Sequence, residues 1–444
     1  MYADMNFSES FKQSGQLCKF SIDGCYVANA TQYRLVVRDV NTLQIKCLFT
    51  CLDSINYIEW SSDSQFILCG LFKRGIIQVW SVENTDWTCK IDHGSMGLTA
   101  VRWAPDGRHI LSTSEFKLRI TVWSLINKSV SYIKYPKHST KGMDFSMDGK
   151  YMALLERRNY KDFVSVFACD SWEMLKHFAT DTKDSSDLSF SPNSCMIAIW
   201  DSKLEYKVVI YSLDGRFISS YSAYDFALGI KSVSWTPSNQ FLAVGSYDQQ
   251  VRLLNNITWK SVCEFKHVTK ITNQNVVVYQ EIERKSVVLP WENEKSSRYS
   301  PPSHYILQEK PFQVPTIRPD PEKPNPKLGV GTVLFSFDNT FMATRNDNMP
   351  NVIWIWDMMK LKLHTVLVQA HPVKVLAWDP KETRLALCAG TNKIYMWSPA
   401  GCLDVEVPCE ADFFVTGLTW HQSGGSLILT SRDQMCMCYL ATPM

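Results

Sequence analysis

Apolar and polar residues alternate along residues 98–125, and this pattern predicts three short β-strands in succession. The first strand ends at Ala104-Pro105-Asp106-Gly107, a turn in which Pro presets φ and Gly accepts a left-handed backbone. The second strand covers residues 108–113, and after a polar turn residues 118–123 alternate with period two and are rich in β-branched side chains. A unit of three or four strands cannot bury both faces alone, so copies of it are expected to stack.

The same succession of an anchor aromatic residue, a polar turn and paired strands recurs along the chain. The anchors are Phe20, Trp60, Trp103, Phe145, Phe190, Trp235, Phe335, Trp378 and Trp420. Their separations are 40, 43, 42, 45, 45, 100, 43 and 42 residues, so one period holds except at a single long gap. A period of about 40–45 residues with four strands per unit is typical of WD-type propellers. The sequence therefore predicts an all-β fold, a WD40-type β-propeller in a single closed ring.

The nine anchors predict nine blades. Because propellers usually have about four to eight blades, a ring of seven or eight blades plus one irregular unit is the alternative. The last unit begins near Phe414 and has room for only three strands. An open seam would expose unpaired strand edges, so we expect residues 5–12 to supply an N-terminal strand that closes the last blade. A frayed N-terminal segment is the alternative to this closure.

The long gap between anchors, residues 268–328, contains nine of the 19 prolines of the chain. Pro removes strand hydrogen-bond donors, so this segment is not expected to form a regular blade, although residues 275–279 and 303–307 have strand character. The predicted organisation is blades one to six with the closing strand in residues 1–267, the Pro-rich insertion in 268–328, and blades seven to nine in 329–444. We expect the insertion to be partly extended and partly disordered, and to emerge on the face that carries the turns described next.

The turns between second and third strands carry aromatic and basic residues. In a propeller these turns open on one face, so side chains distant in sequence are expected to converge there. Aromatic and Arg residues grouped on a surface are typical of protein interfaces, whereas ordinary solvated loops are the alternative interpretation. With one Trp of the insertion added, the candidate partner-binding residues are Phe72, Lys73, Arg74, Phe116, Lys117, Arg157, Arg158, Tyr160, Trp200, Trp291 and Arg345.

Histidines precede several anchors by seven to ten residues, namely His93, His138 and His371. In WD-type repeats a histidine at this place bonds inside its own blade, and turn residues such as Asp248 are candidate partners. We therefore interpret these histidines as structural rather than catalytic or metal-binding.

Composition narrows the class of protein. A formal net charge of +2 argues against a nucleic-acid or membrane-surface protein that binds through bulk electrostatics. The 14 cysteines include no CxxC pair. The two that are closest in sequence, Cys436 and Cys438, are two residues apart on one predicted strand. This spacing fits neither a zinc site nor a disulfide framework. Free thiols in such numbers favour a reducing compartment, the cytosol or nucleus. The start of the chain has no signal-peptide pattern, and no 18-residue apolar run occurs.

Motifs of catalysis are missing from the sequence. No GxxxxGK[ST], GxSxG or HExxH occurs, nor a GxGxxG between a strand and a helix. Several carboxylates stand in Asp-Gly turns, where Asp bonds its own backbone. We therefore predict a binding scaffold with no enzymatic activity, cofactor or metal, in which rigid blades present variable turns to other proteins.

The whole chain resembles the WRAP group of WD-repeat proteins, in particular its centrosomal and spindle-pole branch encoded antisense to a p53-family gene. The segments that carry the resemblance are MNFSESFKQSGQLCKFSIDGCYVANA, GLFKRGIIQVWSVENTDWTCKIDHG, WAPDGRHILSTSEFKLRITVWSL and KSVVLPWENE. The resemblance implies a non-enzymatic adaptor at centrosomes, centriolar satellites and spindle poles, in the cytoplasm and cytoskeleton. Its implied partners are a coiled-coil anchoring protein of the SSX-interacting type and a minus-end kinesin, in microtubule anchoring, spindle organisation and cilium assembly.

A different function class remains as the alternative. Some nine-unit propellers resemble translation initiation factors, so RNA or ribosome association is the second hypothesis. The near-neutral charge and the lack of a combined aromatic and basic stripe weigh against it.

Overall fold

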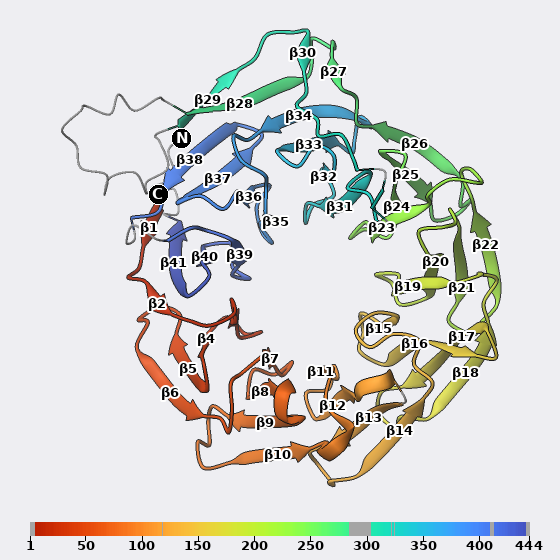
Figure 1. Cartoon of the computed structure of the whole chain (residues 1–444), viewed down its shortest axis with the longest axis vertical. Helices are drawn as coiled ribbons and strands as arrows, with labels where there is room; N and C mark the ends of the chain where they lie inside the picture. Colours follow the sequence, from red (N-terminus) through yellow and green to blue (C-terminus); the bar gives the residue numbers. More distant parts are fainter. Residues whose placement is uncertain are drawn as a thin grey trace. The chain divides into compact units, whose positions relative to one another are not determined.

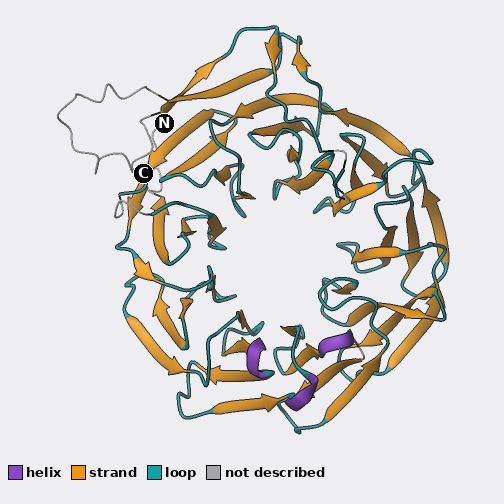
Figure 2. Ribbon diagram, viewed as in Figure 1, coloured by secondary structure: helices purple, strands orange, loops and turns teal. Residues whose placement is uncertain are grey.

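The computed structural model describes residues 5–117, 119–283, 303–320, 322–323, 325–408 and 413–440. These residues form strands and loops, with three single-turn 3-10 helices among them (Figure 2). The helices are η1 (Phe72–Arg74), η2 (Gly94–Met96) and η3 (Glu115–Lys117). The prediction of an all-β fold is confirmed.

The strands assemble into four-stranded antiparallel blades that follow the chain, and the blades fall into two compact units (Figure 1). The five-blade unit comprises Leu17–Ile230 and Ile257–Lys260. The four-blade unit comprises Met1–Gln16, Lys231–Asn256 and Ser261–Met444. Counted over the described residues, the blades number nine, as the anchors predict, and no irregular unit replaces one of them.

In each blade of the five-blade unit the four strands pair in chain order, as they do in Figure 1. Blades one to five consist of β3 (Cys18–Phe20), β4 (Tyr26–Thr31), β5 (Arg34–Asp39), β6 (Ile45–Thr50); β7 (Tyr57–Trp60), β8 (Phe66–Leu71), β9 (Ile76–Ser81), β10 (Thr88–Asp92); β11 (Ala100–Trp103), β12 (His109–Thr113), β13 (Arg119–Ser124), β14 (Val130–Lys134); β15 (Met143–Phe145), β16 (Tyr151–Arg158), β17 (Lys161–Ala168), β18 (Met174–Ala179); β19 (Ser185–Phe190), β20 (Met196–Asp201), β21 (Val208–Ser212), β22 (Phe217–Tyr221).

The four-blade unit follows the same plan with additions at two blades. Blades six to nine consist of β23 (Ile230–Trp235), β24 (Phe241–Ser246), β25 (Gln250–Asn255), β26 (Ser261–Lys266); β31 (Val330–Phe335), β32 (Phe341–Asn346), β33 (Val352–Asp357), β34 (Lys362–Val368); β35 (Val375–Trp378), β36 (Leu385–Cys388), β37 (Lys393–Ser398), β38 (Gly401–Glu406); β39 (Gly417–Trp420), β40 (Ser426–Thr430), β41 (Gln434–Leu440). The added strands are β1 (Met5–Phe7), β2 (Phe11–Lys12), β27 (Lys270–Ile271), β28 (Val277–Glu283), β29 (Ser303–Leu307) and β30 (Phe312–Gln313).

The core lies between neighbouring blades, because both faces of each sheet are covered. Leu68 and Val79 of blade two pack in one cluster with Val101 and Ile110 of blade three, all at most 6% exposed. The middle strands are accordingly apolar almost throughout, as β40 shows with every residue buried. Stacking of blades therefore supplies the burial that a single sheet lacks.

Four of the five anchor tryptophans tie their blade to the one before it. The Trp60 indole N–H donates to the Lys19 carbonyl at 3.2 Å, and Trp103 donates to the Glu59 carbonyl at 3.1 Å. The four-blade unit repeats the contact, with Trp378 on Leu334 at 3.1 Å and Trp420 on Ala377 at 2.9 Å. In every case the acceptor is the residue just before the preceding anchor. A Phe anchor fills the same place without this hydrogen bond, since it has no donor.

The N-terminal segment closes blade nine as predicted. β1 pairs antiparallel with β41, with Met5 opposite Leu440 and Phe7 opposite Cys438, and β2 pairs with the other end of β41. The Gln13 side chain donates to the carbonyls of Ser431 and Gln434, both at 3.0 Å. The alternative of a frayed terminus is wrong for the described residues, which begin at Met5.

The described part of the Pro-rich insertion adds two strands to blade seven, and its later residues contact turns between second and third strands. The Ile317 N–H donates to the Asn348 carbonyl at 2.7 Å, and the Tyr247 hydroxyl donates to Asn325 at 2.8 Å. β28 runs parallel to β34 and adds a fifth strand, and β29 adds a sixth. The reason is that Val277 to Gln280 carry no proline and offer a full set of backbone donors to the β34 edge. β27 and β30 form a separate two-stranded ribbon. The limits of the insertion at 268 and 328 stay a prediction.

A buried histidine that the sequence analysis did not name joins blades six and seven. His267 donates from Nδ1 to the Gln249 carbonyl at 2.9 Å, and its Nε2 accepts from the Thr344 hydroxyl at 2.8 Å. The Trp356 indole donates to the same Thr344 oxygen at 2.9 Å. Of the named histidines, His93 packs against Trp123 at 5.5 Å in a comparable structural role.

Stability is expected to depend on the charge of His267. Burial lowers the pKa of His267 from 6.5 to about 4, so folding favours the neutral imidazole. The contribution of His267 to the free energy of unfolding is fully present above about pH 6.5. It is lost as the pH falls towards about 4, by up to about 1.4 kcal/mol per pH unit. Urea unfolding of the wild type and of His267→Gln should show a stability difference that shrinks over this window. A difference that is constant with pH would contradict the prediction.

Candidate protein-binding surface

One end of the five-blade unit carries the turns between second and third strands and the connections between fourth and first strands. In an antiparallel blade both kinds of connection lie at the same end of the sheet. Phe72 to Arg74 form η1, which Gly75 ends with a φ of 64°. In blade four β16 and β17 pair up to Arg158 and Lys161, leaving the two-residue turn Asn159-Tyr160, with φ of 48° and 63°.

Three aromatic side chains at this end are almost completely exposed to solvent. Phe116 is 88% exposed, Tyr160 is 92% exposed and Phe226, in the connection after β22, is fully exposed. All three have a left-handed backbone, with φ between 61° and 63°. Bulky residues rarely adopt this conformation, and strained positions of this kind cluster at functional sites. We call Phe116, Tyr160 and Phe226 the aromatic tips.

The predicted arginines of this region bind carboxylates of the chain itself. Arg74 Nε lies 2.9 Å from an Asp53 oxygen. Arg157 binds Asp184 at 2.7 Å and the fully buried Asp162 at 3.3 Å.

Arg158 also binds a carboxylate of the chain itself. It binds the buried Glu156 at 2.6 Å and lies 4.7 Å from the centre of the Tyr135 ring. β16 extends to Arg158, so Arg157 and Arg158 lie on a strand rather than in the expected turn.

The remaining predicted residues do not form one group. Trp200 is half-buried on β20 and is therefore not in a turn. Arg345 is at the end of β32 in the four-blade unit, where it donates to the Val373 carbonyl at 2.8 Å. Lys73 is exposed on η1. Trp291 and the side chain of Lys117 lie outside the described residues.

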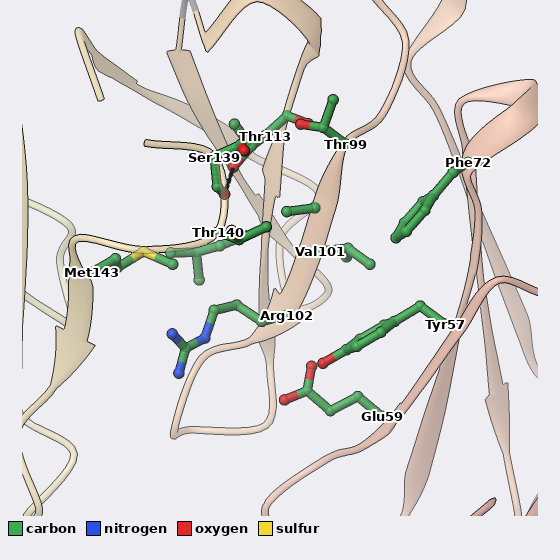
Figure 3. Close-up of a pocket in the computed structure, with 12 residues that line it drawn as sticks. Tyr57, Glu59, Phe72, Thr99, Val101, Arg102, Thr113, Ser139, Thr140 and Met143 are labelled. Atoms are coloured by element: carbon green, nitrogen blue, oxygen red, sulfur yellow. Dashed lines mark hydrogen bonds between the residues drawn. The ribbon is translucent and has the colours of Figure 1, made fainter. Parts of the chain in front are cut away.

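A cavity of about 340 Å³ opens beside Phe72, between blades two and three and the start of blade four. Figure 3 shows Tyr57 and Phe72 along one wall and Thr140 and Met143 along the other. The Tyr57 and Phe72 rings stack at 6.5 Å. We call this cavity the Phe72 pocket; its lining is Tyr57, Glu59, Phe72, Thr99, Ala100, Val101, Arg102, Leu111, Thr113, Ser139, Thr140 and Met143.

Charged side chains of alternating sign occupy equivalent places on the first strands of blades one to four. They are the residues immediately before the anchors: Lys19, Glu59, Arg102 and Asp144. Burial raises the pKa of Glu59 and of Asp144, and burial lowers the pKa of Lys19. Lys19, Glu59 and Asp144 are therefore partly removed from water, and each lies in the field of a neighbour of opposite sign. The repeat pattern of the sequence identifies the anchors but predicts no role for the residues before them.

One side-chain cluster of blade four contains the residue types of a nucleophilic site but not its geometry. Ser165 Oγ donates to Glu156 at 2.6 Å and lies 2.9 Å from His177 Nδ1. Ser165 is fully buried, and the carboxylate contacts Ser165 instead of orienting His177. This cluster is therefore an internal hydrogen-bond group of the blade. Within the described ranges no three His, Cys, Asp or Glu side chains are grouped to hold a metal, and no helix has the length and apolar character to cross a membrane.

Comparison with known proteins defines the class of the fold. Residues 215–255 match the family model "WD domain, G-beta repeat". Among solved structures, the C-terminal WD40 domain of Sif2 matches with a TM-score of 0.53 at 10% sequence identity, over 87% of this chain and 96% of that chain. At this identity the likeness concerns the fold alone. The blades are those of a WD40-type β-propeller.

Sequence relatives then give the family. The mouse protein WD repeat-containing protein WRAP73 is 55% identical over 445 residues, which cover 99% of this chain and 96% of the mouse protein. A WD repeat-containing protein of Schizosaccharomyces pombe, described as uncharacterized, is 25% identical over 400 residues, 87% of this chain and 77% of that protein. The chain belongs to the WRAP73 family of WD-repeat proteins. It is thus a WD-repeat protein of scaffold type, a class that is typically non-enzymatic and binds other proteins.

Proposed function

We propose that the chain is an adaptor of centrosomes, centriolar satellites and spindle poles. In this role it binds a coiled-coil anchoring protein of the SSX-interacting type, with a minus-end kinesin as a further partner, and supports microtubule anchoring, spindle organisation and cilium assembly. The family assignment supports the scaffold role, and the finer cellular role comes from the resemblance of the sequence segments quoted above.

The observation that carries the proposal is the set of aromatic tips. Exposed aromatic residues supply large contact areas, and they are enriched among the residues that dominate binding energy at protein interfaces. Phe116 and Tyr160 are 88% and 92% exposed, so neither contributes a buried side chain to the fold. Two such residues in strained turns at the same end of neighbouring blades are more readily explained by a partner than by stability.

The test is recovery of the coiled-coil protein from cells that express tagged variants of the full chain. The double variant Phe116→Ser/Tyr160→Ser is expected to lose at least about tenfold of the recovered coiled-coil protein and its signal at spindle poles. The matched control is Ile126→Ser/Met147→Ser, because Ile126 and Met147 are 72% and 80% exposed in turns at the other end of blades three and four.

The control variant should recover as much coiled-coil protein as the wild type does, and both double variants should melt at the wild-type temperature. Equal recovery with the test variant and the control would contradict the proposal. Recovery of ribosomal subunits in place of the coiled-coil protein would support the alternative of RNA or ribosome association, and their loss at high salt would confirm an electrostatic contact.

A further inference from the structure

The Phe72 pocket has a chemical character that the aromatic tips do not share. Part of its wall is apolar, since Tyr57 and Phe72 face Met143 and Val101 lies between them, and hydroxyl side chains of Thr and Ser complete the lining (Figure 3). The charged side chains of the lining, Glu59 and Arg102, lie together at one end of the pocket (Figure 3). A volume of about 340 Å³ is at the lower end of the range for small-ligand sites, and it suits one large residue with its main chain.

The carboxylate of Glu59 is held in place but retains bonding capacity. Its Oε2 accepts the backbone N–H of Trp103 at 3.1 Å, and the Tyr57 hydroxyl points at the same carboxylate (Figure 3). Carboxylates accept up to about four hydrogen bonds, so a further donor can be accommodated. Burial raises the pKa of Glu59, because water solvates this carboxylate poorly.

Arg102 supplies donors at the same end of the pocket. Its guanidinium stacks over the Phe145 ring at 4.7 Å, which fixes the direction of the side chain. Arg102 and Glu59 lie near each other (Figure 3), and the positive charge of Arg102 acts on the Glu59 carboxylate. A guanidinium has five N–H donors, and a ligand carbonyl can accept from them.

Charge balance decides what kind of group fits between Glu59 and Arg102. The lining of the pocket carries one charged residue of each sign at this end, Glu59 and Arg102. A cation would meet Arg102, and an anion would meet Glu59, so either ion would be opposed by a charge of its own sign. A neutral peptide group avoids both costs, because its N–H can donate to Glu59 while its carbonyl accepts from Arg102.

We propose that the Phe72 pocket binds one uncharged, large aliphatic residue of an extended partner segment. The side chain packs between Phe72 and Met143, and the main-chain amide bridges Glu59 and Arg102. The inference rests on the proposed protein-binding function and names the residue chemistry that this function recognises in the partner.

The test begins with selection of peptides from a displayed library of random twelve-residue sequences on the purified full chain. The enriched peptide, made with a fluorescent label, is then titrated by anisotropy against variants. We expect a consensus with one invariant Leu, Ile or Met and no charge beside it. Phe72→Ala and Arg102→Met should weaken binding by about tenfold, and Glu59→Gln, which keeps an acceptor for the Trp103 N–H, by about fivefold.

The matched control is Phe217→Ala, because Phe217 is a half-exposed aromatic residue on β22 away from the pocket. It should bind the peptide within twofold of the wild type, and all variants should keep the wild-type melting temperature. Replacement of the invariant aliphatic residue in the peptide by Asp or by Lys should abolish binding in both cases.

Three results would overturn the inference: no enriched peptide, a charged residue at the invariant position, or equal affinity for Phe72→Ala and the wild type. These failures are separate from failure of the proposed function. If the coiled-coil protein is still lost from Phe116→Ser/Tyr160→Ser while Phe72→Ala binds peptide normally, the adaptor proposal stands and only the pocket assignment falls.

Discussion

Replacement of Lys393 by methionine is expected to lower the free energy of unfolding by about 3–5 kcal/mol, because it removes a buried cation from a hydrogen-bonded group. The Lys393 side chain is 2% exposed and its Nζ donates to Ser303 Oγ at 2.8 Å. Carboxylate oxygens of Asp404 and Glu406 lie 3.9 and 4.0 Å from the same nitrogen. Methionine fills a similar volume but leaves these carboxylates without the charge that balances them.

The effect should extend to the strands added to blade seven. Ser303 of β29 also donates to Glu281 of β28 at 2.6 Å, and Glu281 is 5% exposed. Tyr395 donates to the same Glu281 oxygen at 2.9 Å. Lys393 thus stabilises the contact between the hairpin β28–β29 and blade eight, and its loss is expected to free that hairpin before the blades unfold.

Urea unfolding followed by hydrogen exchange checks this prediction. Lys360→Met is the control, because Lys360 is 75% exposed and pairs with Asp357 only at the surface, so its stability should stay close to that of the wild type. Adding Glu281→Gln and Asp404→Asn to Lys393→Met should restore part of the lost stability. If Lys393→Met and Lys360→Met unfold at the same urea concentration, the buried charged group around Lys393 does not stabilise the fold.

Removal of residues 1–12 is expected to open blade nine and to make the chain self-associate. Met5 and Phe7 pack against the apolar cluster of blades eight and nine, and burial of two such side chains contributes roughly 3 kcal/mol. The deletion also exposes the backbone groups of β41, which then form a free strand edge. Size-exclusion chromatography should show oligomers, and thermal unfolding should begin at a lower temperature.

Rescue by a peptide distinguishes an open edge from a general loss of stability. A synthetic peptide of residues 1–14 added in trans should bind the truncated chain and restore the monomer and its melting temperature. The same peptide with Phe7→Asp should not, because position 7 faces the apolar cluster beside Cys438. A truncated chain that remains monomeric with an unchanged melting temperature would refute the role assigned to β1 and β2.

Local patterns predicted the blades because each blade is a local structure. The anchor at Trp103, the turn after it and the strands up to Trp123 are close in sequence, so their spacing alone identified them. The closing strand was also predictable, since a blade of three strands implies a missing edge. The number of blades followed from counting anchors.

Contacts between distant segments could not be predicted in this way. β28 has the alternation of any strand, and nothing in its sequence indicates that its partner is β34, about 90 residues later, or that the pairing is parallel. The role of His267 could not be predicted, because the insertion separates His267 from the next anchor, Phe335. The spacing of seven to ten residues between histidine and anchor is therefore lost. The sequence pattern predicts an exposed turn at Arg157 and Arg158. It does not show that the hairpin continues to these residues or that their acidic partners Asp162 and Glu156 are buried.

The hydrogen bonds of the anchor tryptophans give the array of repeats a polarity. The donor always belongs to the later blade and the acceptor to the earlier one, so each junction depends on which anchor follows it. A repeat that begins with Trp and one that begins with Phe are therefore not interchangeable modules. Duplication or exchange of whole repeats during evolution would alter the bonding at both neighbouring junctions, which favours a fixed order of blades over free shuffling.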